Sequence, residues 1–252
     1  MAHESYSRLC PQADTAFLFI HGILGSPDHF RELTPLVPES CSLVNLLLSG
    51  HGGSPRDFSA TSMERWRSQV SDATGQLLAT HRRVYIVAHS MGTLLAMEQA
   101  VAHPEQIKAL FLIAPPLKVR VMPTIVINGT RVLLGKVDHS DPWSVATRDA
   151  CSLQLNFRFW EYTGWIRRFL ELFSRIHDTR QLLHRVAVPC RAYISHKDEL
   201  VSPESARYLT AIPGVQIRYL SKSGHLYYEP EELSFLKEEF TALVNQAMQE
   251  GA

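Results

Sequence analysis

Ser90 lies in the sequence AHSMG (residues 88–92), between a predicted strand and a predicted helix. The run at residues 83–87 is apolar and β-branched, as in a strand buried on both faces. Residues 93–102 are rich in helix formers. A serine at such a junction lies on a sharp turn that exposes its hydroxyl, and the turn needs small residues two positions before and after it. A serine that caps a helix is the common alternative, but the flanking strand and helix favour a nucleophile.

A serine hydroxyl becomes a strong nucleophile when a histidine can take its proton, and that histidine needs a carboxylate to fix its tautomer. In an open parallel sheet, reactive groups gather at the carboxyl ends of the strands. Among 12 histidines and 25 acidic residues, Asp198 and His225 each follow a predicted strand. Their chain order Ser, Asp, His is that of one hydrolase architecture. We therefore predict that Ser90, His225 and Asp198 form a catalytic triad.

Other residues compete for the histidine and carboxylate positions. His89 adjoins the predicted nucleophile. In a tight turn, however, the side chain next to the nucleophile points away from the serine hydroxyl. His196 lacks the flexible glycine that precedes His225. Glu199 is the reserve acid beside Asp198. Taken singly, the acid and the histidine would be an ordinary loop carboxylate and a surface histidine; their order and their placement after separate strands favour catalysis.

Acyl transfer also needs two backbone N–H groups that stabilise the oxyanion of the tetrahedral intermediate. Met91 supplies the first candidate, because it follows the nucleophile at a helix N-terminus, where the helix dipole helps. The second donor is expected in the loop that leaves the strand at residues 15–20, and Ile23 is the candidate. His21 is expected to brace this loop by hydrogen bonding.

The segments that must position these residues alternate between strands and helices. Apolar runs predict strands at residues 15–20, 41–48, 83–87, 108–113, 188–194 and 215–220. Capping residues and periodicity predict helices at residues 26–36, 62–80, 93–102, 202–211 and 230–249. This alternation implies parallel β-α-β units, and 252 residues suffice for one large domain. We predict an α/β fold with a mostly parallel central sheet and helices on both faces.

The alternation breaks between residues 117 and 186, where aromatic residues are concentrated. We predict that residues 117–186 form a helical cap, inserted into a core made of residues 1–116 and 187–252. The alternative is an ordinary buried helix pair. A cap of this kind would line an acyl pocket, for which the candidate residues are Trp143, Phe159, Trp165 and Phe169.

Composition argues against several classes of partner. Lys plus Arg and Asp plus Glu both number 25, so the neutral chain is not expected to bind nucleic acid or an anionic membrane surface. No apolar run reaches the roughly 18 residues of a spanning helix, and residues 1–12 are too polar for a secretory signal. The cysteines are far apart, and no cluster has metal-ligand spacing. We expect a cytoplasmic protein with free thiols, no metal or cofactor, and an oligomeric state that the sequence leaves open.

The sequence resembles the α/β-hydrolase superfamily, and within it the bacterial carboxylesterases and monoacylglycerol-lipase-like enzymes. The matching motifs are HGILGS (21–26), GHG (50–52), AHSMG (88–92), KDELV (197–201) and GH (224–225). Two features depart from the family pattern. Ala88 stands where the family usually has glycine, and the short segment before residue 15 cannot hold the full set of opening antiparallel strands.

The resemblance implies an α/β-hydrolase fold with a helical cap and a serine hydrolase that needs no cofactor. The implied substrates are small-molecule carboxylic esters with short to medium acyl chains, including monoacylglycerols. One alternative is a thioester or C–C bond hydrolase with the same triad. Another is a binding protein that kept the fold without turnover. The motifs are specific for fold and triad but not for substrate.

Overall fold

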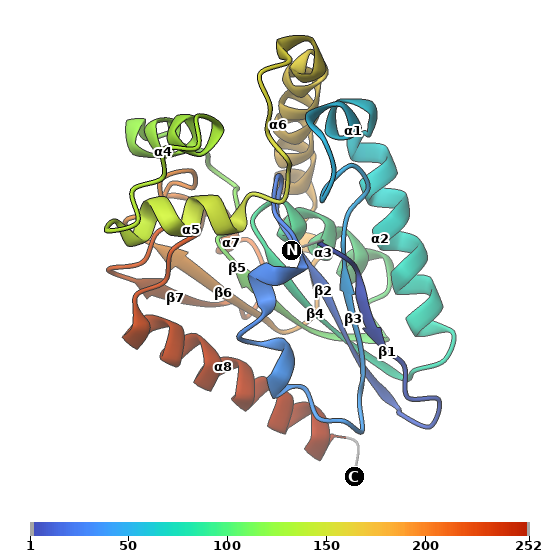
Figure 1. Cartoon of the computed structure of the whole chain (residues 1–252). Coiled ribbons are helices and arrows are strands. Elements are labelled where there is room, and N and C mark those ends of the chain that lie inside the picture. The colour runs from blue at the N-terminus through green and yellow to red at the C-terminus, as the bar shows by residue number, and fades with distance from the viewer. Residues whose placement is uncertain (1–2, 251–252) are drawn as a thin grey trace.

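A seven-stranded sheet with the order β1-β3-β2-β4-β5-β6-β7 forms the centre of the computed structural model, which describes residues 3–250 (Figure 1). The strands are β1 (Tyr6–Arg8), β2 (Thr15–Ile20), β3 (Ser42–Leu46), β4 (Arg83–His89), β5 (Ile107–Ile113), β6 (Cys190–Ser195) and β7 (Gln216–Leu220). Strand β1 is antiparallel to β3, and the neighbours from β3 to β7 are parallel. The predicted α/β class with a mostly parallel sheet is confirmed.

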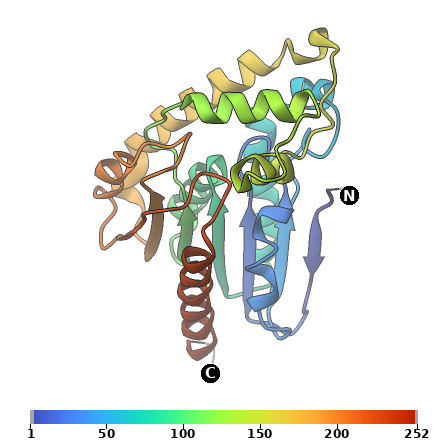
Figure 2. The same cartoon turned by 60° about the vertical axis from the view of Figure 1, so that its left-hand side comes forward.

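Helices lie on both faces of this sheet (Figures 1 and 2). They are α1 (Pro55–Ala60), α2 (Met63–Leu78), α3 (Met91–Ala102), α4 (Pro123–Leu133), α5 (Pro142–Ala150), α6 (Trp165–Leu182), α7 (Ser205–Leu209) and α8 (Pro230–Gln249). Within residues 3–250, no helix combines the length and the apolar character that crossing a bilayer requires.

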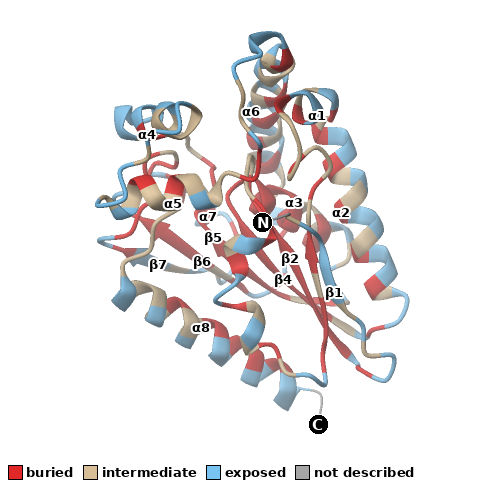
Figure 3. Cartoon of the chain, in the orientation of Figure 1, coloured by how far each residue is buried: buried red, intermediate tan, exposed pale blue. Residues whose placement is uncertain are grey.

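Strand β2 shows how the sheet buries both of its faces. Its side chains alternate, so Phe17 and Phe19 belong to one apolar cluster while Leu18 belongs to the other. The two phenylalanine rings contact Phe240 of α8, with centroids 6.0 and 5.9 Å apart. The opposite cluster contains residues of α2 and α3. Every residue of β2 is buried (Figure 3), which explains why its sequence is continuously apolar.

Three helical segments differ from the prediction. Residues 26–36 form two 3-10 helices, Pro27–Phe30 and Thr34–Leu36, because Pro35 has no backbone N–H to continue an α-helix. Helix α7 begins at Ser205 and is shorter than predicted. Helix α1 was missed, although Ser54 and Asp57 form a capping box: the N–H of Asp57 donates to Ser54 Oγ at 3.3 Å, and the N–H of Ser54 donates to Asp57 Oδ2 at 2.8 Å.

The long connection between β5 and β6 contains α4, α5 and α6 and, among the described residues, no named strand. It covers the loops that follow the strands: the N–H of Ser152 donates to Leu24 C=O at 3.0 Å, and the ring of Trp143 lies against Gly224. Figures 1 and 2 show these helices over one end of the sheet. The division into a core and a cap at residues 117 and 186 stays a prediction.

Candidate active site

Ser90 occupies the sharp turn between β4 and α3 with φ 50° and ψ −124°. A non-glycine residue rarely adopts this left-handed region, and such strain concentrates at functional sites. The turn is held from both sides. The N–H of Ser90 donates to Ile113 C=O at 2.9 Å, and a Cβ on Gly92 would collide with the carbonyl oxygens of Ile20 and His21. The serine hydroxyl is therefore presented on a rigid support.

The structure brings Ser90, His225 and Asp198 together at the ends of β4, β7 and β6. Ser90 Oγ lies 3.0 Å from His225 Nε2, and His225 Nδ1 lies 2.8 Å from Asp198 Oδ2. The other carboxylate oxygen of Asp198 accepts the N–H groups of Leu200 (2.8 Å) and Val201 (2.6 Å). Since both Asp198 oxygens are engaged, the carboxylate has one orientation and fixes the histidine with Nε2 free to take a proton from serine.

Two of the competing residues, Glu199 and His89, hydrogen-bond to the backbone of His225, and the ring of His89 also lies 4.7 Å from that of His225. Glu199 Oε2 accepts the backbone N–H of His225 at 2.8 Å, and burial raises the pKa of Glu199. His89 Nε2 lies 3.1 Å from the carbonyl oxygen of His225. His196 is exposed and stacks on Tyr219, with centroids 5.0 Å apart. The loop-holding roles of Glu199 and His89 were not predicted, because a hydrogen bond from a side chain to the backbone of a distant segment has no sequence signature.

The charge of Asp198 sets the proton affinity of His225. Burial of the imidazole lowers its pKa, but the nearby carboxylate and the hydrogen bond to it outweigh this effect, and the pKa lies above its ordinary value of 6.5. A general base must be neutral before it takes a proton. The site is therefore active when the pH is above the raised pKa of His225, where the imidazole is neutral.

We expect kcat/KM for an activated ester to fall as the pH falls through the pKa of His225, with a midpoint above 6.5. The reason is that protonated His225 cannot accept the serine proton. The measurement is the pH dependence of kcat/KM, with circular dichroism at each pH to show that the protein stays folded. A profile that is level from pH 8 down to pH 5 in a folded protein would contradict the role of His225.

The loop after β2 lies directly over Ser90 and carries one of the two expected oxyanion donors. A Cβ on Gly22 would lie 3.3 Å from Ser90 Oγ, so only a glycine lets this backbone approach. The next N–H, that of Ile23, donates to no other residue among those that the structure describes. Met91 is the first residue of α3, where N–H groups have no acceptor within the helix. Both groups are free to serve as donors to an oxyanion.

Two neutral histidines brace this loop. His21 Nε2 accepts the N–H of Leu48 at 3.0 Å, while His21 Nδ1 donates to Gly22 C=O at 2.8 Å. His51 Nε2 accepts the N–H of Leu24, a residue with φ 60°, at 3.1 Å. Burial lowers the pKa of His21 well below 6.5 and that of His51 to about 4. The brace by His21 was predicted; that by His51, in the GHG motif, was not.

A cavity of about 400 Å³, called the triad cavity below, is lined by His225, Gly22 and Ile23 and by apolar side chains from α4 to α6. Trp165 and Phe169 line it, as predicted for the pocket. Cys151 also lines it, but burial raises the pKa of its thiol, so that thiol is a poor source of thiolate. Residues 3–250 contain no group of three or more side chains that could hold a metal ion.

The predictions for Trp143 and Phe159 need correction. Phe159 is 78% exposed and lies beside Trp160, because the 3-10 turn at Phe159–Tyr162 directs Glu161 inward instead. Trp143 lines a neighbouring cavity with Glu199, and its ring lies 5.4 Å from that of Tyr227. Aromatic content indicated the right segment but not which rings face the triad cavity.

Residues 17–234 match the model of the alpha/beta hydrolase family, and the chain belongs to this family. Among curated proteins, the probable lysophospholipase BODYGUARD 1 of Arabidopsis thaliana is 34% identical to this chain over 112 aligned residues. The alignment covers 42% of this chain and 24% of that protein. The chain thus matches about a quarter of that relative's length.

Solved structures resemble the chain over nearly its whole length. A structure of the metagenome-derived lipolytic enzymes LipS and LipT has a TM-score of 0.72 and 17% identity, covering 97% of this chain and 98% of that one. The monoacylglycerol lipase of Paleococcus ferrophilus has a TM-score of 0.66 and 15% identity, with the same coverage. At these identities the comparison establishes a shared fold.

Proposed function

We propose that this protein is a serine hydrolase that cleaves small-molecule carboxylic esters through an acyl-enzyme intermediate. The observation that carries the proposal is the line of Ser90, His225 and Asp198, with contacts of 3.0 and 2.8 Å, beside an apolar cavity. Three convergent groups with a serine on a strained turn are the arrangement that acyl transfer needs.

In the proposed reaction, Ser90 Oγ attacks the ester carbonyl while His225 Nε2 takes its proton. The N–H groups of Ile23 and Met91 donate to the resulting oxyanion. The tetrahedral intermediate expels the alcohol, which receives the proton from His225, and leaves an acyl ester on Ser90. Water then attacks that ester with His225 again as base, which releases the carboxylic acid and restores the serine. Asp198 keeps its negative charge and stabilises the imidazolium.

The apolar triad cavity supports substrates with a short to medium acyl chain, including monoacylglycerols. The names of the similar proteins, a probable lysophospholipase and a monoacylglycerol lipase, support the same class. Residues 117–186 would act as the cap that supplies this apolar surface. The cysteines all lie in the described part of the chain and are free, which supports a reducing compartment and a cytoplasmic location.

The direct test is labelling with an active-site phosphonate, read by mass spectrometry of the modified peptide, together with hydrolysis of p-nitrophenyl butyrate. The proposal expects stoichiometric modification of Ser90 and loss of the hydrolysis. A protein that neither reacts nor hydrolyses any ester of the series below would instead be a binding protein that kept the fold. Comparing kcat/KM for p-nitrophenyl butyrate with kcat/KM for a butyryl thioester shows whether the enzyme prefers esters or thioesters.

We expect kcat/KM to rise with acyl length from acetate over several carbons, by up to about fourfold per CH₂. Each buried CH₂ contributes about 0.8 kcal/mol, and 1.36 kcal/mol corresponds to a tenfold change in rate. The measurement is kcat/KM for p-nitrophenyl esters of increasing length. Phe169→Ala should flatten the rise, because Phe169 lines the triad cavity, whereas the exposed Phe159→Ala should keep it. A profile that falls steadily from acetate would contradict the acyl-pocket assignment.

A further inference from the structure

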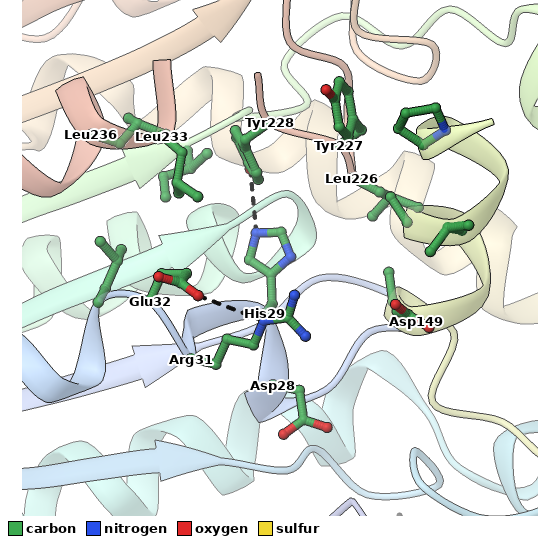
Figure 4. Close-up of a pocket in the computed structure, with 16 residues that line it drawn as sticks. Asp28, His29, Arg31, Glu32, Asp149, Leu226, Tyr227, Tyr228, Leu233 and Leu236 are labelled. Carbon is green, nitrogen blue, oxygen red and sulfur yellow. Dashed lines mark hydrogen bonds and ion pairs between the residues drawn. The ribbon is translucent and has the colours of Figure 1, made fainter. Parts of the chain in front are cut away.

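A second cavity of about 340 Å³, whose lining side chains are drawn in Figure 4, shares part of its lining with the triad cavity. It is bordered by the first 3-10 helix (Pro27–Phe30), α5, the loop after β7 and the start of α8, and it opens to solvent. His29, Ala150 and Leu226 line both cavities. These side chains therefore form the wall between the two spaces.

The second cavity is apolar inside and charged at its edge. Most of its apolar lining comes from α5, β5, α8 and the loop before α8, and includes Ile113, Val145, Ala146, Leu226, Leu233 and Leu236. The charged side chains in its lining are all on exposed residues, Asp28, Arg31, Glu32 and Asp149. An uncharged alkyl chain fits such a space, while a terminal carboxylate would meet an excess of negative charge at the edge.

His29 is the largest polar part of the shared wall. Its ring stacks on that of His89, with centroids 3.7 Å apart, and its Nε2 lies 3.3 Å from Tyr228 Oη. Figure 4 shows the ring pointing toward Tyr228 across the middle of the second cavity. Burial and the proximity of His225 lower the pKa of His29 to about 3, so the ring is uncharged near neutral pH.

We propose that His29 is a specificity-determining residue that ends the triad cavity and thereby limits the length of the substrate chain. The inference rests on the proposed ester hydrolysis. If the ring is removed, the second cavity adds about 340 Å³ to the 400 Å³ beside the triad and nearly doubles the space for an alkyl chain. Among the described residues, the ring makes no hydrogen bond to Ser90 Oγ or to the expected oxyanion donors. It reaches the triad only through the stacked ring of His89, so the rates of each variant are compared with its own rate for acetate.

The test compares the acyl-length profile of kcat/KM in the wild type and in His29→Ala, each normalised to its own value for acetate. The maximum is expected to move by at least roughly two carbons toward longer chains, since each further buried CH₂ can add up to about fourfold. His29→Phe keeps an aromatic wall and Tyr228→Phe removes the hydrogen bond to His29; both should keep the wild-type maximum. An unchanged maximum in a folded, active His29→Ala variant would overturn the proposal.

Two further variants keep the test decisive. Ala146 lines the second cavity but not the triad cavity, so Ala146→Phe added to His29→Ala should refill the space and restore the wild-type maximum. If His29→Ala does not fold, Leu226→Ala opens the same wall and should move the maximum in the same direction. If that variant too shows the wild-type maximum, the two cavities do not act as one and the proposal fails.

A binding experiment separates this inference from the proposed function. The dissociation constants of hexanol, decanol and tetradecanol, measured by calorimetry, report the room behind His29 without any turnover. If no ester is hydrolysed but the preferred alcohol is longer in His29→Ala than in the wild type, the proposed function fails, while the role of His29 as the end of the triad cavity is supported for a bound alkyl chain. If esters are hydrolysed but neither the binding nor the rate profile moves, the inference alone fails.

Discussion

Replacing Ser90 with alanine is expected to lower kcat for an activated ester by about 10⁴- to 10⁶-fold while leaving a folded protein. Alanine keeps the Cβ and so brings no new strain at φ 50°. Within residues 3–250, the side chain of Ser90 hydrogen-bonds to His225 Nε2 alone, so folding loses little when the hydroxyl is removed. Residual catalysis by the oxyanion donors and by binding can still reach about 10³–10⁴ over water.

The matched control is Ser234→Ala, which removes an exposed serine hydroxyl on α8 that donates to Pro230 C=O at 3.0 Å. This variant should keep the wild-type kcat. The double variant Ser90→Ala/His225→Ala should be little slower than either single variant, because triad residues act as a unit. A Ser90→Ala protein that hydrolyses the ester at near the wild-type rate means that another group is the nucleophile.

Exchanging the two neighbouring acids for their amides should give very different results. Asp198→Asn is expected to lower kcat by about 10⁴-fold, because an amide that donates to Nδ1 holds His225 in the wrong tautomer. Glu199→Gln should lower it by less than about tenfold, since the Gln carbonyl oxygen can still accept the backbone N–H of His225. The measurement is kcat above the pKa of His225, where the imidazole of the wild type is neutral.

Circular dichroism and thermal unfolding of both variants serve as the control for folding, since Asp198 Oδ1 also accepts two backbone N–H groups. A large loss of kcat at Glu199 together with a tolerated change at Asp198 would move the acid by one position. Equal losses at both positions would mean that the geometry of the loop, rather than the tautomer of His225, limits turnover.

The parts that sequence predicted well depend on local patterns. The continuous apolar run of β2 reflects burial on both faces of the sheet, and the small residues around Ser90 reflect the close approach of Gly92 to the backbone after β2. The candidate triad could be assembled because parallel strands place their carboxyl ends together. Chain order then selected one acid and one histidine.

The parts that sequence missed depend on contacts between distant segments. Tyr228 and His29 are 199 positions apart, and no periodicity predicts that their side chains meet at 3.3 Å. The wrong assignment of Phe159 has the same origin, because the direction of that ring follows from one turn of 3-10 helix and not from its apolar character. Cavities arise from the packing of several elements, and the second cavity had no sequence signal.

The connection between β5 and β6 leaves and re-enters the sheet at neighbouring strands, which are held in register by pairs such as Leu110 with Cys190. Because β5 and β6 are parallel, the connection starts at the carboxyl end of β5 and returns at the amino end of β6, and the pairing of the two strands fixes both points. Doubling the length of a flexible loop costs only about 0.6 kcal/mol of closure entropy, and Ser90 and His225 lie outside this segment. The exposed part of this segment can therefore be lengthened at little cost to the sheet, whereas α6 cannot be exchanged freely, because Leu172 and Ile176 belong to the apolar cluster that packs against the sheet.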